Sequence, residues 1–326
     1  MVLDTRSRRW AERYSPDSDD FAAITGKEQS DIGRPGAGRI VRLTWQEARP
    51  PVQIIFALRF LAGAVLAGGV PALLSRHVLL SLLGWCCVVA AVYVHNGTED
   101  VVEDRRNASQ RPVAAGRLPV GTARAVARAL AAAGLLASAA LDPRAGALAA
   151  LMLACGWAYS SGARPWKNTV PGFVFIVVSG GLLTYLAGSV AVGARWSAPL
   201  CCFALVMSCW MAVAGSTKDL PDSDGDRCAG RRTLPVLYGQ RRAARLTALG
   251  TLAVGAGFHT VALHHVPTLL TCASVLLVGA VVIAVTLVAT PADAGRDRRR
   301  RPYRAFMITQ YAVHSALFVS ALLAVM

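Results

Sequence analysis

The segment NGTEDVVEDRRNASQRPVAAGR, residues 96–117, is the strongest indication of the fold and function of this chain. Asn96, Asp100 and Asp104 are spaced four apart, so on a helix their side chains form one polar stripe. Like charges at this spacing repel by roughly 0.2–0.5 kcal/mol per pair. The stripe also begins where a long apolar segment ends, and unpaired carboxylates next to hydrocarbon are costly. We interpret the stripe as part of a cation-binding site.

A second acidic segment, KDLPDSDGDRCAGRRTLPV at residues 218–236, repeats the pattern. Asp219, Asp222 and Asp226 are spaced three and four apart and share one face of a helix. A calcium-binding loop is the alternative, since Asp224 alternates with two of these acids, but the glycine and the closing glutamate of such a loop are not in their places. Mg²⁺ is typically held by one or two carboxylates plus substrate phosphates. We therefore predict two acidic stripes that face one another and share Mg²⁺ ions and a diphosphate.

The composition indicates a polytopic membrane protein. Of the 326 residues, 54% are hydrophobic and 16% are charged, and the mean hydropathy is +0.45, whereas about a quarter of the residues in a soluble domain are charged. The net charge of +15 and the pI of about 10.2 suggest nucleic-acid binding. The arginines, however, lie in short loops between apolar runs and not on one module with interleaved aromatics. We expect no nucleic-acid partner.

Nine apolar runs predict nine transmembrane helices in one all-α bundle. Most reach the roughly 20 residues that cross a bilayer, and backbone groups in lipid must be paired internally, which favours helices. A β-barrel is excluded because alternation of period two is absent. We assign residues 51–326 to this bundle and residues 1–50 to a polar cytoplasmic arm that lacks the features of a signal peptide. The runs cover residues 52–74, 78–96, 122–141, 145–161, 170–193, 197–216, 243–263, 268–290 and 303–325.

The loops predict the orientation of the chain. By the positive-inside rule, the loops richest in arginine and lysine face the cytoplasm, together with the N-terminal arm. Both acidic segments then lie on the cytoplasmic side, and nine spans place the C-terminus outside. We expect an integral membrane protein of the plasma membrane. The basic residues that set this orientation are Arg105, Arg106, Arg111, Arg117, Arg164, Lys167, Lys218, Arg227, Arg231, Arg232, Arg241, Arg242, Arg296, Arg298, Arg299, Arg300 and Arg301.

Basic residues near the acidic segments are candidates for binding diphosphate. The segment YSSGARPWKN places Arg164 and Lys167 at the cytoplasmic end of the fourth and fifth spans, where they could neutralise diphosphate oxygens. Ordinary positive-inside charge is the alternative for Arg164. Arg111 and Arg227 follow the aspartates of their own segments and complete the predicted diphosphate-binding set.

Other residues of chemical interest give weaker signals. Seven of the eight cysteines lie inside apolar runs and none forms a Cys-x-x-Cys pair, so we interpret them as small buried hydrophobes. Cys228 lies alone in the second acidic segment. Arg59 lies within an apolar run, where an ionisable residue indicates a function unless its side chain snorkels to the surface.

The combined pattern resembles the UbiA superfamily of intramembrane prenyltransferases over roughly residues 45–326. The resemblance rests on Asn-x-x-x-Asp-x-x-x-Asp followed by Arg-Pro-x-x-x-Gly, and on Asp-x-x-Asp-x-x-x-Asp followed by Gly-x-x-Thr-Leu-Pro. It implies an all-helical bundle around a central cavity, with Mg²⁺ held between two aspartate motifs. The matching residues are Asn96, Asp100, Asp104, Arg111, Pro112 and Gly116, and then Asp219, Asp222, Asp226, Gly230, Thr233, Leu234 and Pro235.

The resemblance also implies a role for individual residues. Lys167 matches the lysine after the fourth span that contacts diphosphate in the family. Gly97 departs from the pattern, since many members carry an aspartate after the asparagine, and this weakens assignment to the quinone-pathway branches. The residues that match catalytic, metal-binding aspartates are Asp100, Asp104, Asp222 and Asp226, and those that match the polar position opening each motif, as further metal ligands, are Asn96 and Asp219.

The activity implied by the resemblance is Mg²⁺-dependent transfer of a prenyl group from an allylic isoprenyl diphosphate to an acceptor, often a small aromatic acid or phenol. Mg²⁺ and cationic side chains stabilise the charge that develops on the leaving diphosphate. An allylic cation then forms in an apolar cavity without water, and an electron-rich ring is alkylated. The base that removes the ring proton is not identifiable from the sequence.

Other functions share parts of the pattern. Some members of the superfamily cyclise the prenyl diphosphate itself as membrane terpene cyclases, because the same ionisation begins both reactions. A transporter would carry acids and broken helices near the middle of the membrane, whereas here the acids gather at one face. A purely structural membrane protein needs no pair of convergent acidic stripes. The sequence sets neither the length of the prenyl chain nor the oligomeric state.

Overall fold

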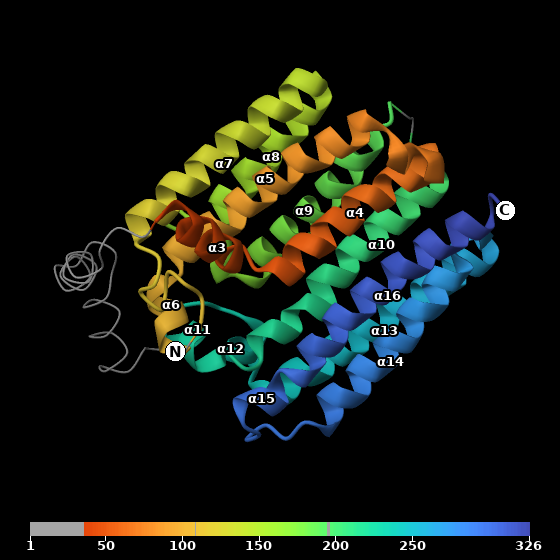
Figure 1. Cartoon of the computed structure of the whole chain (residues 1–326). Coiled ribbons are helices and arrows are strands. Elements are labelled where there is room, and N and C mark those ends of the chain that lie inside the picture. Colours follow the sequence, from red (N-terminus) through yellow and green to blue (C-terminus); the bar gives the residue numbers. More distant parts are fainter. Residues whose placement is uncertain (1–35, 108, 194–195) are drawn as a thin grey trace.

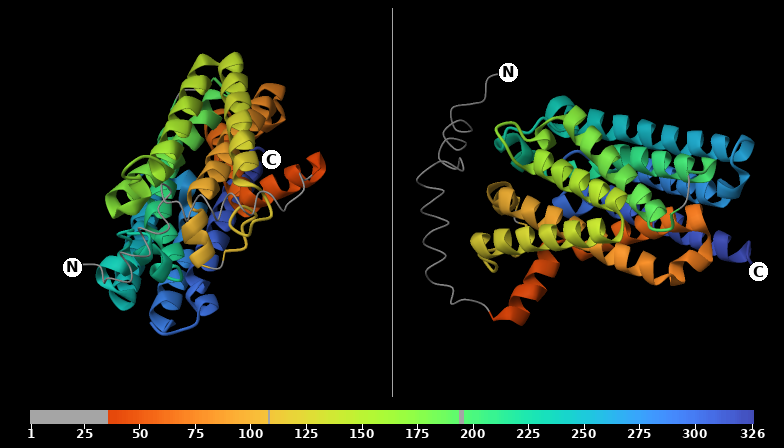
Figure 2. Two further views of the ribbon diagram at one scale, coloured as in Figure 1. Left: turned by 90° about the vertical axis from the view of Figure 1, so that its left-hand side faces the viewer. Right: turned by 90° about the horizontal axis from the view of Figure 1, so that it is seen from above.

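The computed structural model describes residues 36–107, 109–193 and 196–326. All regular elements in this part of the chain are helices, and the only β pairing within it is an isolated bridge between Thr169 and Arg232. Within these described residues, nine long helices run side by side in one bundle (Figures 1 and 2). They are α4 (Pro50–Gly68), α5 (Arg76–Glu99), α7 (Val120–Leu141), α8 (Pro143–Ser160), α9 (Val170–Val190), α10 (Ala198–Ala214), α13 (Gln240–His264), α14 (Leu270–Ala289) and α16 (Arg301–Leu323).

Eight of the described helices are long and apolar enough to cross a membrane. The prediction of an all-α bundle of membrane-spanning helices is therefore confirmed, whereas the count of nine spans is not. The helix α8 forms where the sequence predicted a span at residues 145–161, but it has 18 residues and is not one of the eight. Its first turn contains a proline and an arginine, which lower its apolar character.

Capping residues set where three of the long helices begin. Asp142, Thr169 and Ser197 precede α8, α9 and α10, and each side chain accepts a hydrogen bond from a backbone N–H of the first turn. Each cap is followed within two residues by a proline, which fits the first turn because the N–H that it lacks would have no partner there. These local signals explain why the helices start close to the beginnings of the apolar runs.

The first span, α4, packs against α5, α9, α10 and α16. Its approach to α9 is close because a glycine lies on each helix. A Cβ atom at Gly63 would lie 2.1 Å from the carbonyl oxygen of Tyr185, and a Cβ atom at Gly188 would lie 1.9 Å from that of Phe60. Small residues permit such backbone contact between membrane helices. The pair α4 and α9 therefore depends on glycine at both positions.

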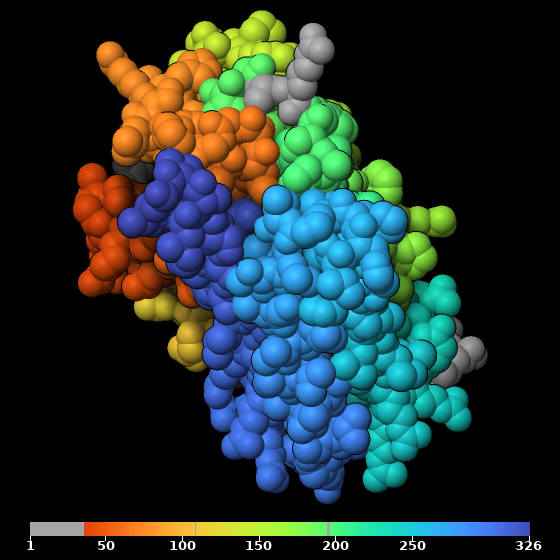
Figure 3. All heavy atoms as spheres, turned by 90° about the vertical axis from the view of Figure 1, so that its right-hand side faces the viewer, coloured from red at the N-terminus to blue at the C-terminus, as the bar shows by residue number. Residues whose placement is uncertain are grey.

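The described residues form three apolar clusters, of which the smallest joins α3 (Ala37–Glu47), α5 and α7 through Leu43, Val94 and Ala123. Of the two larger clusters, one is built from α4, α5, α8 and α9 and includes Phe56, Trp85 and Met152. The other joins α10, α13, α14 and α16 and includes Phe203 and Trp210. The last span, α16, lies between α4 and α14 and connects the two halves (Figure 3).

Short helices gather at one end of the bundle, opposite the C-terminal end of α16 (Figure 1). The first of them shows that the final part of the predicted arm packs on the bundle, because Leu43, Glu47 and Ala48 are buried. The rest of the arm, residues 1–35, lies outside the described residues. Both acidic segments lie at this end. The short helices are α3 (Ala37–Glu47), α6 (Val101–Arg106), α11 (Ser223–Cys228), α12 (Leu234–Tyr238) and α15 (Arg296–Arg299).

Candidate active site

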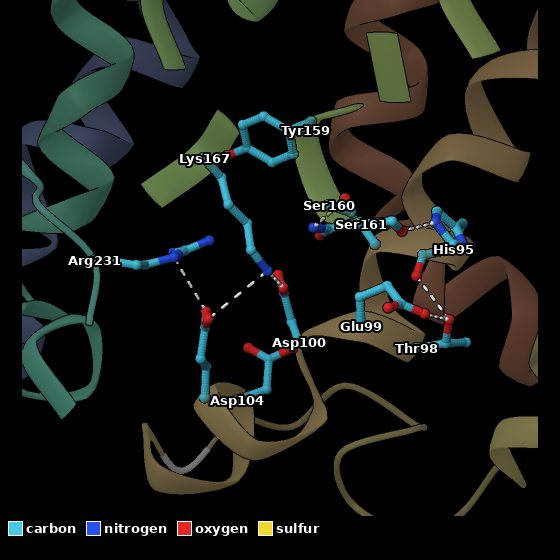
Figure 4. A network of polar contacts seen from close by, with 12 residues as sticks. His95, Thr98, Glu99, Asp100, Asp104, Tyr159, Ser160, Ser161, Lys167 and Arg231 are labelled. Atoms are coloured by element: carbon cyan, nitrogen blue, oxygen red, sulfur yellow. Dashed lines mark hydrogen bonds and ion pairs between the residues drawn. The ribbon is translucent and has the colours of Figure 1, made fainter. Parts of the chain in front are cut away.

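The first acidic segment lies across a break between two helices. The helix α5 ends at Glu99, Asp100 has non-helical dihedral angles, and α6 begins at the next residue, so the single continuous stripe that the spacing predicted is interrupted. Asp100 forms a buried ion pair with Lys167, which follows the fourth long apolar run (Figure 4). The Nζ atom of Lys167 also lies 3.7 Å from Oε1 of Glu103. The lysine therefore holds two acids of this segment at once.

The two acidic segments meet at Arg231. Its Nε atom lies 3.3 Å from Oε2 of Glu103 in α6, and its Nη1 atom lies 3.2 Å from Oδ1 of Asp226 in α11. The Thr233 hydroxyl donates a hydrogen bond of 3.3 Å to the other carboxylate oxygen of Asp226. A guanidinium can hold two carboxylates because its N–H donors form a rigid, planar fork. The segments face one another, as predicted, and an arginine that was not predicted joins them.

Arg111 links the first acidic segment to the short helix α3. Its Nε atom lies 2.6 Å from Oε1 of Glu47 in α3, and its Nη1 atom lies 3.3 Å from both Oδ1 of Asn96 and Oδ2 of Asp104. Asn96 is fixed further because its amide donates a hydrogen bond of 3.1 Å to the Ser160 hydroxyl. Arg111 thus contacts two of the predicted metal ligands.

Glu47 occupies the space beside Gly97. Its side chain is fully buried, and Oε2 accepts a hydrogen bond of 2.9 Å from the backbone N–H of Val113. A Cβ atom at Gly97 would lie 1.9 Å from Oε1 of Glu47 and 2.5 Å from Nη2 of Arg111. The missing side chain at position 97 is therefore matched by a carboxylate that α3 brings to the same place.

The second acidic segment is also broken. A 3₁₀ helix, η3 (Gly215–Asp219), is followed by a turn and then by α11, so the three predicted acids do not share one regular helix. Pro221 lies in that turn and cannot continue a helix without loss of a backbone hydrogen bond. Asp219 lies 3.7 Å from Nζ of Lys218, and Asp222 pairs at 2.6 Å with Arg296 from α15. Asp222 thus connects the site to the start of the last span.

Two predicted diphosphate-binding residues make none of these ion pairs between the acidic segments and their cationic partners. Arg164 is exposed in the turn after α8, and Arg227 is exposed on α11. Lys167 and Arg111, in contrast, are both buried and take part in them. The structure therefore brings together two of the four predicted cationic side chains.

A cavity of about 230 Å³ opens beside the two acidic segments. Lys167, Lys218 and Arg231 line its polar end, and Phe173 and Leu246 belong to its apolar wall. The Nζ atom of Lys218 donates a hydrogen bond of 3.2 Å to the Tyr159 hydroxyl and lies 5.0 Å from the Phe173 ring centre. The cavity lies between α8, α9, α10 and α13, so it combines positive charge with an apolar surface.

Burial and charge separate the acids of the site by their pKa values. Burial alone would raise the pKa of Asp100, but the Lys167 ammonium and the Arg231 guanidinium outweigh it and lower that pKa to about 2. For Glu103 burial prevails over Arg231 and raises the pKa to about 7. Burial also raises the pKa of Asp226, against the opposing effect of Arg231. Asp100 is therefore ionised at neutral pH and available as an oxygen ligand.

The donor set fits Mg²⁺ bound together with a diphosphate. Within the described residues, no group of three or more acidic, histidine or cysteine side chains is placed to hold a metal ion by itself. Mg²⁺ needs no such group, because it keeps several waters and is typically held by one or two carboxylates plus phosphate oxygens. Asp100, Asp104 and Asp226 offer oxygen atoms only, each paired here with a cationic side chain. These oxygens suit a hard cation that arrives with its own anion.

Four residues of the site were not predicted. Glu103 is three residues after Asp100, so the same helical spacing argument could have found it. Lys218 is adjacent to the first acid of the second segment, and Arg231 is five residues after Asp226, where it was counted only as loop charge. Glu47 carries no comparable signal, because nothing in the sequence connects it with a residue 64 positions later.

The chain belongs to the UbiA prenyltransferase family, whose model matches residues 56–325. A digeranylgeranylglyceryl phosphate synthase from Ignicoccus hospitalis is 31% identical over 209 residues, which is 60% of this chain and 65% of that protein. Another from Natronomonas pharaonis is 40% identical over 84 residues, 26% of this chain and 27% of that protein. Each match thus spans less than two thirds of the relative's own length.

The fold matches that of a UbiA homolog from Archaeoglobus fulgidus bound to GPP and Mg²⁺. The TM-score is 0.65 at 18% identity, and the match covers 86% of this chain and 99% of the other. Family membership confirms the resemblance predicted from the two motifs. The chain is therefore an integral membrane protein of this family.

Proposed function

We propose that this enzyme catalyses the Mg²⁺-dependent transfer of a prenyl group from an allylic isoprenyl diphosphate to an acceptor. The observation that carries the proposal is the pair of cationic bridges at the site. Lys167 contacts Asp100 and Glu103, and Arg231 contacts Glu103 and Asp226. The bridges lie beside a cavity with an apolar wall, as a diphosphate with an apolar chain requires. The fold match to a homolog bound to GPP and Mg²⁺ supports this assignment.

The acids of both segments would hold the metal, and bound Mg²⁺ supplies Lewis-acid stabilisation of the leaving diphosphate. Lys167 and Arg231 donate charge-assisted hydrogen bonds to diphosphate oxygens, and Arg111 keeps the first segment in position. Arg164 and Arg227, being exposed, attract the diphosphate from solution. The proposed metal ligands are Asn96, Asp100, Asp104, Asp219, Asp222 and Asp226.

The apolar wall of the cavity accounts for the rest of the substrate. Val170, Phe173 and Leu246 offer apolar contact to an isoprenoid chain. A wall of this kind also keeps water away from the carbon that loses diphosphate, so an acceptor and not water takes the prenyl group. The ring faces of Tyr159 and Phe173 lie near the positive end, where electron-rich rings stabilise positive charge.

The acceptor belongs to one of two classes. An aromatic acid or phenol fits the cavity, since Tyr159 and Phe173 can stack on its ring and Lys218 can pair with its acidic group. A prenylglyceryl phosphate is the second candidate, favoured by the names of the two curated relatives. We further propose that the enzyme lies in the plasma membrane with the site and the N-terminal arm in the cytoplasm and the C-terminus outside, because basic residues concentrate in the loops at the site.

The test is an assay of diphosphate release by the purified enzyme with Mg²⁺ and geranyl, farnesyl or geranylgeranyl diphosphate. Three parallel reactions contain no acceptor, 4-hydroxybenzoate, or a prenylglyceryl phosphate, and the products are identified by mass spectrometry. We expect release that depends on an acceptor, with the prenylated acceptor as product. A cyclic hydrocarbon or alcohol formed without acceptor would instead establish a cyclase. No release with any of the three diphosphates would refute the proposal.

A further inference from the structure

A second cavity, of about 240 Å³, lies outside the candidate active site. It is formed where the first turns of α13 and α16 meet the last turn of α14 and the short helix α15 (Figure 1). This is the end of the bundle at which the basic loops lie. None of the residues used in the proposed chemistry lines it. The proposed reaction therefore does not explain which ligand the side chains of this cavity would bind.

The polar lining of this cavity is positive. Arg241, Arg245 and Arg299 contribute to it, and the described residues that line it include no acid. Arg241 and Arg245 form no ion pair within the described part of the chain, in contrast to the paired arginines of the active site. The Nε atom of Arg299 is buried without a hydrogen-bond partner. Three guanidinium groups around one hollow repel each other unless an anion binds between them.

The N-terminus of α13 adds to this positive potential. Its first residues, Gln240 and Arg241, line the cavity. Helix N-termini carry a partial positive charge and unpaired N–H groups, and both favour phosphate. The arginines and this helix end therefore select the same kind of ligand.

The surface next to the cavity changes from basic to apolar along the helices. On α13 the spacing of four that places Arg241 and Arg245 on one face continues to Leu249, which is 66% exposed. On α14 Val288 lines the cavity at 72% exposure, and Val285 follows one turn deeper at 61%. A ligand with a phosphate at one end and a hydrocarbon chain at the other matches this order.

We propose that the second cavity binds the phosphate group of an anionic membrane lipid. Charge-assisted hydrogen bonds from Arg241, Arg245 and Arg299 hold the phosphate, and an acyl chain lies along Leu249 and Val288. Basic pockets between membrane helices on the cytoplasmic side are known to bind lipid headgroups in this way. A soluble phosphate has the same chemistry, and its binding is distinguished by experiment.

The cavity is connected to the second acidic segment through hydrogen bonds from the side chains of Gln240 and Arg299. The carbonyl oxygen of Leu220 accepts hydrogen bonds from Gln240 at 2.8 Å and from Arg299 at 3.5 Å, and Gln240 also donates to the Ser223 hydroxyl at 2.8 Å. Leu220 and Ser223 flank Asp222 on either side along the chain. A phosphate that fixes Gln240 and Arg299 therefore also steadies the segment that carries this acid, and it raises the thermal stability of the protein.

The test measures binding of phosphatidylglycerol to the full chain purified in detergent, by native mass spectrometry and by the shift in unfolding temperature. Phosphatidylcholine and inorganic phosphate are parallel ligands. The variant R241Q/R245Q removes two charges from the cavity. The control R242Q/R298Q removes two exposed charges, one next to Arg241 on α13 and one next to Arg299 on α15, at residues that do not line the cavity. Unfolding of both variants without lipid verifies that they fold.

We expect wild type and the control to retain one phosphatidylglycerol, and R241Q/R245Q to bind it at least about tenfold more weakly, since each hydrogen bond to a charged group contributes a factor of that order. Equal stabilisation by inorganic phosphate would support the site and assign it to a soluble phosphate. Equal loss of binding in R241Q/R245Q and R242Q/R298Q would overturn the proposal, because attraction would then depend on overall surface charge. Equal retention of phosphatidylcholine and phosphatidylglycerol would overturn it as well.

Discussion

Removal of the Glu47 carboxylate tests how the first acidic segment is held. In Glu47→Ala, Arg111 loses its partner at 2.6 Å, and the N–H of Val113 loses its acceptor at 2.9 Å. Loss of one partner from a buried ion pair costs about 3–5 kcal/mol. Arg111 keeps its contacts with Asn96 and Asp104 at 3.3 Å each, which favours the lower end of that range. An unfolding entropy of about 2.1 cal/mol/K per residue over 326 residues gives about 1.5 °C per kcal/mol, so we expect the unfolding temperature to fall by about 4–5 °C.

The same site offers a compensating change. A side chain at Gly97 would enter the space of the Glu47 carboxylate, so Gly97→Asp alone is expected to destabilise the protein. In the Glu47→Ala background that space is free, and an aspartate at position 97 brings a carboxylate back to Arg111. The double variant E47A/G97D should therefore recover a large part of the unfolding temperature and of diphosphate release.

The assays are thermal unfolding in detergent and the release of diphosphate, both for the full set of single and double variants. The coupling between the two positions is read from the double-mutant cycle. Additive effects of Glu47→Ala and Gly97→Asp would refute the idea that both positions supply the same carboxylate. Wild-type stability and activity in Glu47→Ala would refute the role of Glu47 itself.

Three further changes test other parts of the account. Arg231→Gln should weaken binding of the isoprenyl diphosphate at least about tenfold, because both acidic segments lose their common partner, and unchanged KM and kcat would contradict this. Burial raises the pKa of Glu103 from 4.5 to about 7, so the folded chain binds the extra proton between these values and stability falls as pH rises from about 5 to 7; Glu103→Gln should remove that slope in thermal unfolding, and a persistent slope would argue against it. Arg59 is fully buried, bonded to Gln310, with two nitrogen atoms that lack hydrogen-bond partners; because a buried charge without an ionic partner is costly, Arg59→Met should leave stability unchanged or raise it, and a large loss would show that the charge is needed.

Much of the bundle could be predicted from the sequence because hydrophobic length is a local property. The apolar run at residues 170–193 became α9 (Val170–Val190), and the last run became α16 (Arg301–Leu323). The helix break in each acidic segment was not predicted. In the second segment Pro221 could have indicated it, because proline cannot continue a helix without loss of a backbone hydrogen bond. At Asp100 the chain leaves the helix without a proline or glycine at that position, and tertiary contact with Lys167 fixes the turn.

The cationic partners of the acids were the least predictable part of the site. Lys167 and Arg164 were both selected by their position, and the resemblance supported Lys167, yet Arg164 is exposed and Arg231 lies at the centre. In a chain with many loop arginines, spacing along the sequence cannot tell which of them enters a site formed from several helices. Glu47 and Arg111 show the same limit, because their contact depends on how α3 packs against α5.

The most direct test of the central claim measures Mg²⁺-dependent release of diphosphate by the wild type, Asp100→Asn and Asp226→Asn. These side chains come from two segments that lie more than a hundred residues apart in sequence and that Lys167, Glu103 and Arg231 join in space. If one site is built from both segments, each substitution abolishes release while the protein still unfolds in a single cooperative thermal transition. Release at the wild-type rate in either variant, with an unchanged requirement for Mg²⁺, would show that the two segments do not form a common site.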